Sequence, residues 1–328
     1  MANVIIAGGA GFIGSHLVDC MVGAGHMVTV LDNFSTGRPE NLDHIKSKIN
    51  LIECDVGVAG DWQRVFADAH YVFHLAALAD IVPSIQNPTD YFQSNVTGTL
   101  NVLEASRDAP LRKVVYVASS SAYGIPKSYP TNEDSDIKPQ YPYALTKWLG
   151  EELILHWGKV YSLPVISLRL FNVYGPRSRT SGTYGAVFGV FLAQKLAGKP
   201  FTIVGDGTQT RDFTYVSDVV NALHVAATSE KEGEVYNVGS GNTVSVNRIA
   251  DLIGGPKVYI PKRPGEPDCT FADISKINGD LAWSPAVSIE EGVSNLLNKI
   301  NYWSAAPVWT EELIEEATSD WFKYLAEK

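Results

Sequence analysis

A glycine-rich turn near the N-terminus limits the possible folds of this chain more than any other feature. Residues 8–14 (GGAGFIG) separate a short apolar run, which predicts a strand, from a helical pattern that begins at Phe12. Glycines let backbone N–H groups approach a ligand closely, and the positive end of a helix favours a pyrophosphate. The next strand pattern ends at Asp32, about twenty residues further on, where a carboxylate can accept hydrogen bonds from ribose hydroxyls. Turn and acid together predict a dinucleotide site.

The same region bears on which dinucleotide binds. The Asp32 carboxylate would repel the 2′-phosphate of NADP, so the sequence favours NAD, although Arg38 follows closely enough to accommodate such a phosphate. Asp55 and Val56 follow the third predicted strand and are candidates for contact with the adenine. An acid in that place is about equally often a turn or capping residue.

Short β-rich apolar runs alternate with helical patterns through the first half of the chain. Predicted strands occupy residues 4–7, 28–32, 51–54, 71–75, 114–118 and 165–170, and predicted helices occupy 12–22, 62–66, 91–107 and 143–160. This alternation is typical of βαβ units that build a parallel sheet covered on both faces. The predicted fold class is α/β, a Rossmann-type doubly wound parallel sheet with a smaller α/β C-terminal domain.

Longer turns after Asn172 indicate where the second domain begins. We expect residues 1–171, with residues 213–240 returning to them, to form the dinucleotide-binding domain, and residues 172–212 and 241–328 to form the smaller one. Near the C-terminus, apolar residues recur every four positions and predict an amphipathic helix that packs on the body or on a partner subunit. This face consists of Trp309, Leu313, Ala317, Trp321 and Leu325.

Composition disfavours several classes of partner. The 328 residues include 26 Lys and Arg against 36 Asp and Glu, and the net charge of −10 argues against nucleic acid or an anionic membrane as the main partner. Cys20, Cys54 and Cys269 lack the spacing of a metal site or a disulfide framework. The chain begins with a strand pattern rather than a leader peptide, and its longest apolar stretch, residues 184–193, is shorter than the roughly 20 residues of a membrane span. We expect no metal, no membrane segment and a cytoplasmic location.

Tyr143 and Lys147 lie four residues apart at the start of a predicted helix, so their side chains project from one face. A free phenol, with a pKa of about 10, is a poor base at neutral pH, but a nearby ammonium and a positively charged nicotinamide favour the phenolate. An ordinary surface helix is the alternative interpretation. Two other Tyr/Lys pairs with this spacing are less suited, because one contains Gly and Pro and the other ends the chain; they are 123/127 and 324/328.

Several further motifs resemble those of the extended short-chain dehydrogenase/reductases, in particular the UDP-galactose and UDP-N-acetylhexosamine 4-epimerases. The resemblance runs almost from end to end. Its motifs are residues 8–14, 74–77 (HLAA), 119–124 (SSSAYG), 143–147 (YALTK), 168–177 (LRLFNVYGPR), 211–213 (RDF) and 263–266 (RPGE).

The resemblance implies roles for individual residues. Tyr143 would be the catalytic base, Lys147 its partner, and Ser119 would hydrogen-bond the reacting hydroxyl. The implied NAD contacts are Gly8, Gly11, Phe12, Ile13, Gly14, Asp32, Asn33, Asp55, Val56, Leu75, Ala76, Ala77, Asn95, Tyr143, Lys147 and Phe171. The implied nucleotide-sugar contacts are Ser120, Ser121, Asn172, Thr202, Val204, Arg211, Arg263, Glu266 and Thr270.

Chemistry independently favours two of these substrate contacts. Arg211 and Arg263 carry planar forked donors that suit a diphosphate in an otherwise acidic protein, although any single arginine is more often a surface ion-pair residue. Glu266 would accept hydrogen bonds from ribose hydroxyls, where many relatives carry aspartate.

The reaction that the resemblance implies is epimerisation at C4, in which hydride leaves C4, the 4-keto sugar turns over and hydride returns. Relatives that dehydrate carry an acidic pair directly after the catalytic Ser/Thr, where this chain has Ser120 and Ser121. A 4,6-dehydratase or a net 4-dehydrogenase/reductase is therefore the second interpretation. A non-catalytic NAD-binding regulatory module is the third, but such a module would be expected to lose Tyr143 or Lys147.

The resemblance also bears on which sugar is the substrate and on the oligomeric state. Thr270 occupies the gatekeeper position and is small enough for an N-acetyl group, and residues 182–184 (GTY) resemble the N-acetylhexosamine enzymes. Ala79 and Asp80 depart from hexose epimerases that place a lysine there, and Val204 replaces an aromatic of some uridine sites, which leaves the base open. We expect UDP-GlcNAc/UDP-GalNAc rather than UDP-Glc/UDP-Gal. The helices at 91–107 and 143–160 match those through which the family commonly forms homodimers.

Overall fold

The computed structural model describes residues 1–178 and 187–326, and its centre is a seven-stranded parallel sheet. The strand order is β11-β6-β5-β4-β1-β2-β3. Strands are first added on one side of β1, and from β4 onward they are added on its other side, so the strand order reverses between β1 and β4. The strands are β1 (Asn3–Ala7), β2 (Met27–Asp32), β3 (Ile49–Glu53), β4 (Tyr71–His74), β5 (Lys113–Ser119), β6 (Val165–Leu170) and β11 (Glu234–Val238). The predicted α/β fold class with a Rossmann-type sheet is confirmed.

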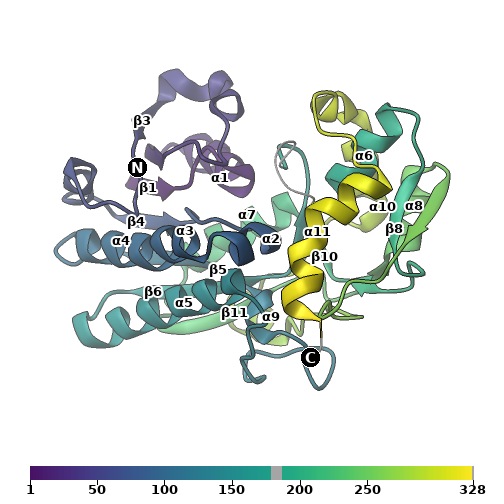
Figure 1. The fold of residues 1–328 in the computed structure, drawn as a ribbon. Coiled ribbons are helices and arrows are strands. Elements are labelled where there is room, and N and C mark those ends of the chain that lie inside the picture. The colour runs from purple at the N-terminus through teal and green to yellow at the C-terminus, as the bar shows by residue number, and fades with distance from the viewer. Residues whose placement is uncertain (179–186, 327–328) are drawn as a thin grey trace.

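Alternate residues of each central strand face opposite layers of helices. In β1, Val4 and Ile6 pack with α1 (Phe12–Gly23), α7 (Val216–Thr228) and α9 (Ser275–Leu281) on one face. Ile5 and Ala7 pack on the other face with α4 (Gly98–Ser106), α5 (Pro142–Tyr161) and the 3-10 helix Asp61–Phe66. Both faces are covered (Figure 1), which explains why these strands are apolar throughout rather than alternating.

Two of the predicted helices differ in detail. The segment predicted as a helix over 62–66 is a 3-10 helix, Asp61–Phe66. The helix predicted over 91–107 consists of α3 (Pro88–Phe92), a π-helical turn (Gln93–Thr97) and α4. Within that turn the Asn95 side chain bonds the backbone of Leu78, which ties the helix to the loop after β4. The periodicity of apolar residues alone does not predict such a π-helical turn, in which the helix is locally wider.

A second, smaller body of structure follows β6 and faces the carboxyl ends of the sheet strands (Figure 1). Its core joins α6 (Val187–Leu196), α8 (Val246–Ile253), α10 (Ile289–Asn298) and the 3-10 helix Ile300–Trp303 around β8 (Phe201–Val204). The remaining elements are α2 (Ile81–Gln86), β7 (Asn172–Tyr174), β9 (Thr210–Arg211), β10 (Phe213–Tyr215), β12 (Val244–Ser245), β13 (Lys257–Ile260), α11 (Glu311–Leu325) and short 3-10 helices at Pro39–Asn41, Asp43–Lys48 and Ser120–Tyr123. The segment 213–240 supplies α7 and β11 to the sheet body.

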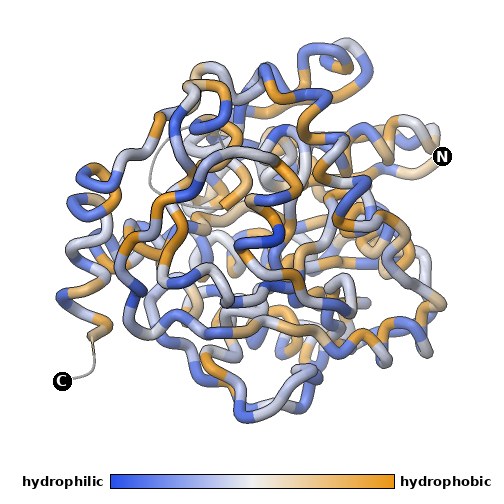
Figure 2. Tube along the Cα trace, turned by 90° about the vertical axis from the view of Figure 1, so that its right-hand side faces the viewer, coloured by the Kyte–Doolittle hydropathy of each residue, from blue (hydrophilic) through white to orange (hydrophobic). Residues whose placement is uncertain are grey.

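The C-terminal helix α11 is amphipathic, and Figure 2 shows hydrophobic and hydrophilic residues alternating along it. Its buried side chains are Ile314, Thr318 and Trp321, whereas Leu313 is 47% exposed. The predicted face was therefore wrong at Leu313. An α-helix has 3.6 residues per turn, so residues spaced exactly four apart shift around the helix and away from its buried side.

Candidate active site

A cavity of about 660 Å³ lies between the carboxyl ends of the sheet strands and the smaller body. Parallel sheets bind ligands at this edge, where the strand order reverses. The structure brings together most of the residues predicted from the sequence. Those that line the cavity are Gly8, Gly11, Phe12, Ile13, Gly14, Asp32, Asn33, Asp55, Val56, Leu75, Ala76, Ala77, Ser119, Ser120, Ser121, Tyr143, Lys147, Phe171, Asn172, Thr202, Val204, Arg211, Arg263 and Glu266.

The glycine turn forms one wall of the cavity and requires glycine on steric grounds. Gly8 adopts φ +83°, and a Cβ there would lie 2.6 Å from the backbone nitrogen of Ala76. A Cβ at Gly14 would collide with the carbonyl oxygen of Gly8. The turn therefore packs against the loop after β4 and leads into the N-terminus of α1, which leaves backbone N–H groups and a positive helix end toward the cavity.

Asp32 ends β2 beside this turn and is 7% exposed. Its carboxylate accepts hydrogen bonds from the backbone N–H groups of Ala10 at 2.8 Å and Phe34 at 2.9 Å. Burial raises the pKa of this carboxyl, and the two hydrogen bonds oppose the rise. Arg38, which could have served a 2′-phosphate, forms an ion pair with Glu40 at 3.6 Å. These residues fit the adenosine ribose of NAD.

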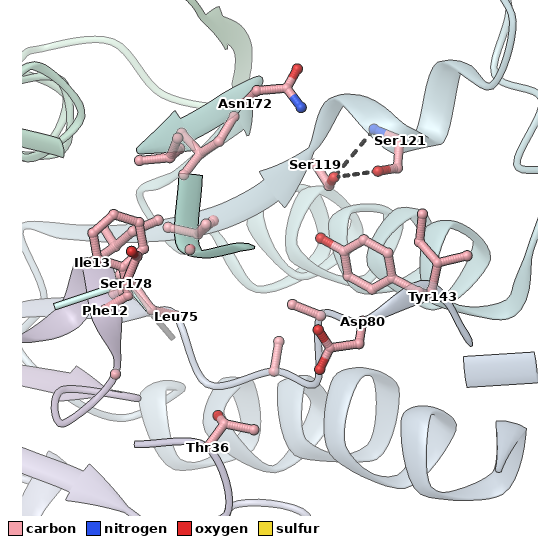
Figure 3. A pocket seen from close by; sticks show the side chains of 18 of the residues that line it. Phe12, Ile13, Thr36, Leu75, Asp80, Ser119, Ser121, Tyr143, Asn172 and Ser178 are labelled. Carbon is pink, nitrogen blue, oxygen red and sulfur yellow. Dashed lines mark hydrogen bonds between the residues drawn. The ribbon is translucent and has the colours of Figure 1, made fainter. Parts of the chain in front are cut away.

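Ser119 and Tyr143 lie close together at one end of the cavity (Figure 3). Ser119 ends β5, and its hydroxyl donates to the Ser121 hydroxyl at 3.0 Å and accepts from the Ser121 N–H at 3.2 Å. Burial raises the pKa of Tyr143, hydrogen bonding to Ser119 lowers it, and the charge of Asp80 raises it. Deprotonation of this phenol therefore depends on positive charge brought close to it.

Lys147 lies one helical turn from Tyr143 on α5 and is 4% exposed. Its ammonium sits 4.3 Å from the centre of the Tyr116 ring. Burial lowers the pKa of Lys147 to about 7, and the Glu151 charge, one turn further along, opposes this. Gly150 lets α5 approach β5 this closely, because a Cβ there would collide with the Tyr116 hydroxyl. Helix α5, which carries Tyr143 and Lys147, is thus held tightly against the sheet.

At the other end of the cavity two arginines share one carboxylate. Glu266 lies 2.8 Å from Arg211 Nη2 and 3.0 Å from Arg263 Nε. Both guanidinium groups are largely buried and line the cavity together with Thr202 and Val204. Clustered forked donors beside a carboxylate suit a diphosphate and its neighbouring ribose hydroxyls.

Two predicted contact residues lie outside the lining of the cavity. Asn95 is buried behind the loop after β4, where its amide donates to Thr146 Oγ1 at 3.0 Å as well as to the Leu78 carbonyl. Thr270 donates to Asn172 Oδ1 at 2.8 Å and so orients a lining residue. Both side chains lie outside the lining, and their polar atoms form hydrogen bonds with other residues of the protein. The predicted segment 182–184 lies outside the described residues.

Some side chains that line the cavity had no role assigned from the sequence. Asp80 lies beside Tyr143 (Figure 3), and Trp309 and Trp321 come from the C-terminal region. Asp80 lies three residues after the end of the HLAA motif, so its position was a usable signal. The tryptophans carried only the periodicity of an amphipathic helix.

The fold and the cavity together define a class of protein, a Rossmann-type NAD-dependent enzyme. A model of the NAD dependent epimerase/dehydratase family matches residues 4–239, and the chain belongs to this family. Its cofactor is NAD, and it is an enzyme of the epimerase type.

Known proteins resemble the chain over nearly its whole length. UDP-glucose 4-epimerase of Mycolicibacterium smegmatis is 36% identical over 303 residues, which are 89% of this chain and 96% of that protein. The UDP-N-acetylglucosamine 4-epimerase of Methanobrevibacter ruminantium, solved with UDP-N-acetylmuramic acid, is 33% identical, with a TM-score of 0.85 and coverage of 91% and 99%. The UDP-glucuronic acid 4-epimerase of Bacillus cereus, solved with UDP-glucuronic acid and NAD, is 34% identical, with the same TM-score and coverage.

Other classes of site find no support in the described part of the chain. No helix among these residues is long and apolar enough to cross a membrane. Within residues 1–178 and 187–326, no group of three or more His, Cys, Asp or Glu side chains is arranged to hold a metal ion.

Proposed function

We propose that this enzyme interconverts UDP-hexoses that differ in configuration at C4, with UDP-GlcNAc and UDP-GalNAc as the preferred pair and UDP-Glc and UDP-Gal as the second. The observation that carries the proposal is the convergence of Ser119, Tyr143 and Lys147 at the end of a cavity that also contains the Arg211–Glu266–Arg263 cluster. A sugar and a diphosphate need sites of these two kinds at the two ends of one cleft.

The residues divide the proton chemistry between them. Tyr143, once deprotonated, takes the proton of the C4 hydroxyl, and Ser119 holds that hydroxyl by a hydrogen bond. Lys147 lies on the same helix face and favours the phenolate when it is protonated. NAD, when bound, would supply the hydride acceptor. The residues that would hold it are the glycine turn and Asp32.

The 4-keto sugar must expose its other face before the hydride returns, and the cleft must therefore hold the diphosphate while leaving the sugar free to turn. Arg211 and Arg263 are suited to this task because they lie on a different body of structure from Tyr143. Ser120 and Ser121 supply no carboxylic acid next to Ser119, which supports epimerisation over dehydration.

The preference for N-acetylated sugars is supported by Thr270 and by one relative. Thr270 is small, and it holds Asn172 beside the cavity rather than filling the space itself. The relative from M. ruminantium is an epimerase of UDP-N-acetylglucosamine.

The test is to incubate the purified protein with UDP-GlcNAc and no reductant, to identify products by NMR and to record absorbance of reduced nicotinamide. Formation of UDP-GalNAc without net change in the cofactor is expected. A stable keto or deoxy product would instead establish the dehydratase or dehydrogenase alternative, and an untouched sugar would require other nucleotide sugars, including those with another base.

We further infer a homodimer formed through α4 and α5, and a cytoplasmic location. Leu145, Val160 and Tyr161 are exposed on α5, which supports such an interface. The free cysteines Cys20, Cys54 and Cys269 support a reducing compartment. Sedimentation of the protein would measure the assembly directly.

A further inference from the structure

The C-terminal helix α11 lies between the sheet body and the smaller body (Figure 1), and its Trp321 lines the cavity. It packs against α2, which belongs to the sheet body, and Gln86 donates to Asp320 at 2.8 Å. Ile314 of the same helix packs with Val204 and Ile260 of the smaller body. The helix therefore joins the two bodies that form the cleft.

Trp321 is the residue by which this helix reaches the cavity. Its side chain is 4% exposed, and it lines the cavity together with Trp309. The indole N–H donates to the carbonyl oxygen of Pro264 at 2.6 Å, and the guanidinium carbon of Arg263 lies 5.1 Å from the ring centre. The ring is thus fixed beside the diphosphate end of the proposed substrate.

The same ring also lies near the proposed reaction centre. Tyr141 lies 6.3 Å from Trp321, measured between ring centres, and stacks on Tyr143 at 6.4 Å with an interplanar angle of 9°. Trp321 therefore contacts both the arginine that would hold the diphosphate and Tyr141, whose ring stacks on the proposed base Tyr143. In a UDP-hexose, the hexose is the group between these two points.

We infer that Trp321 forms one wall of the hexose subsite and packs against the apolar C–H surface of the sugar or of its N-acetyl group. Because Pro264 already accepts the indole N–H, the ring offers only carbon to the cavity. Aromatic faces suit aliphatic C–H groups and keep water away from them. This inference rests on the proposed function, since it takes the ligand to be a nucleotide sugar, but the residue assignment does not depend on which hexose is used.

The test compares binding of UDP-GlcNAc with binding of UDP alone. The proteins carry Tyr143→Phe so that the sugar is not turned over, and isothermal titration calorimetry measures Kd with NAD bound. Trp321→Ala should weaken UDP-GlcNAc about tenfold while UDP changes by no more than about twofold. Trp321→Phe, which keeps an aromatic face, should recover UDP-GlcNAc binding to within roughly threefold of the parent. The matched control is Phe322→Ala, an exposed aromatic of the same helix, and it should leave both Kd values unchanged.

Three outcomes would overturn the assignment. Equal weakening of UDP and UDP-GlcNAc would mean that Trp321 acts only by placing Arg263. Unchanged Kd values in Trp321→Ala, or equal losses in Phe322→Ala, would mean that the ring does not contact the sugar. If the parent binds UDP but neither UDP-GlcNAc nor UDP-Glc, the proposed substrate is wrong, and the same comparison with the nucleotide sugar that does bind decides the role of Trp321. Melting temperatures of the variants show whether each protein is folded.

Discussion

Replacing Glu151 by Leu should destabilise the enzyme by about 3–5 kcal/mol, because it leaves Arg169 as an uncompensated charge in the interior. The two side chains are 1% and 7% exposed, and Arg169 donates to the Glu151 carboxylate through Nε at 3.0 Å and Nη2 at 2.6 Å. Ser167 Oγ donates to the same carboxylate at 2.8 Å. The pair fastens the catalytic helix α5 to β6. Its loss should also lower the pKa of Lys147 further, since Glu151 is the charge that raises it.

A double-mutant cycle measures this contribution. Glu151→Leu should lower the melting temperature by about 4–7 °C in a chain of this length. Glu151→Leu combined with Arg169→Met should recover most of that loss, because well-packed apolar pairs often replace buried ion pairs at little cost. Thermal unfolding followed by tryptophan fluorescence provides the assay. A loss below about 1 kcal/mol in Glu151→Leu, or a double variant as unstable as the sum of the single ones, would refute the reasoning.

Three further perturbations test the site. Tyr143→Phe should lower kcat for epimerisation by about 10²–10⁴-fold with NAD binding retained, measured by product NMR and nicotinamide fluorescence; a smaller loss would remove Tyr143 as the base. Asp80→Asn should raise kcat/KM for UDP-glucuronate relative to UDP-Glc by about tenfold, because a carboxylate beside Tyr143 disfavours an anionic sugar; an unchanged ratio would place Asp80 away from the sugar. Burial lowers the pKa of Lys147 to about 7, so between that value and the ordinary lysine pKa the unfolded chain binds one more proton. The free energy of unfolding of the NAD-free protein should therefore rise with pH above 7, and Lys147→Met should flatten that rise, as denaturant titrations at several pH values would show.

The parts of the site that follow from short segments could be predicted from the sequence alone. The glycine turn and Asp32 are fixed by strand, turn and helix in succession, and four-residue spacing on one helix fixes how Tyr143 and Lys147 lie. The parallel sheet follows from the same local pattern, because alternating strands and helices have few other ways to bury their apolar faces.

Contacts between distant segments were decided only by the tertiary structure. Asn95 and Thr270, predicted ligand contacts, lie outside the cavity lining, and their polar atoms hold the loop at Leu78 and the side chain of Asn172. In the sequence, Trp321 belongs only to the apolar face of a predicted amphipathic helix. Such a pattern predicts that one face is buried, but it does not predict which residues cover that face. The place of Trp321 beside Arg263 and Tyr141 depends on how the last helix crosses both bodies of the fold. Long-range packing determines how this helix crosses the two bodies, and the spacing of residues along the chain does not predict it.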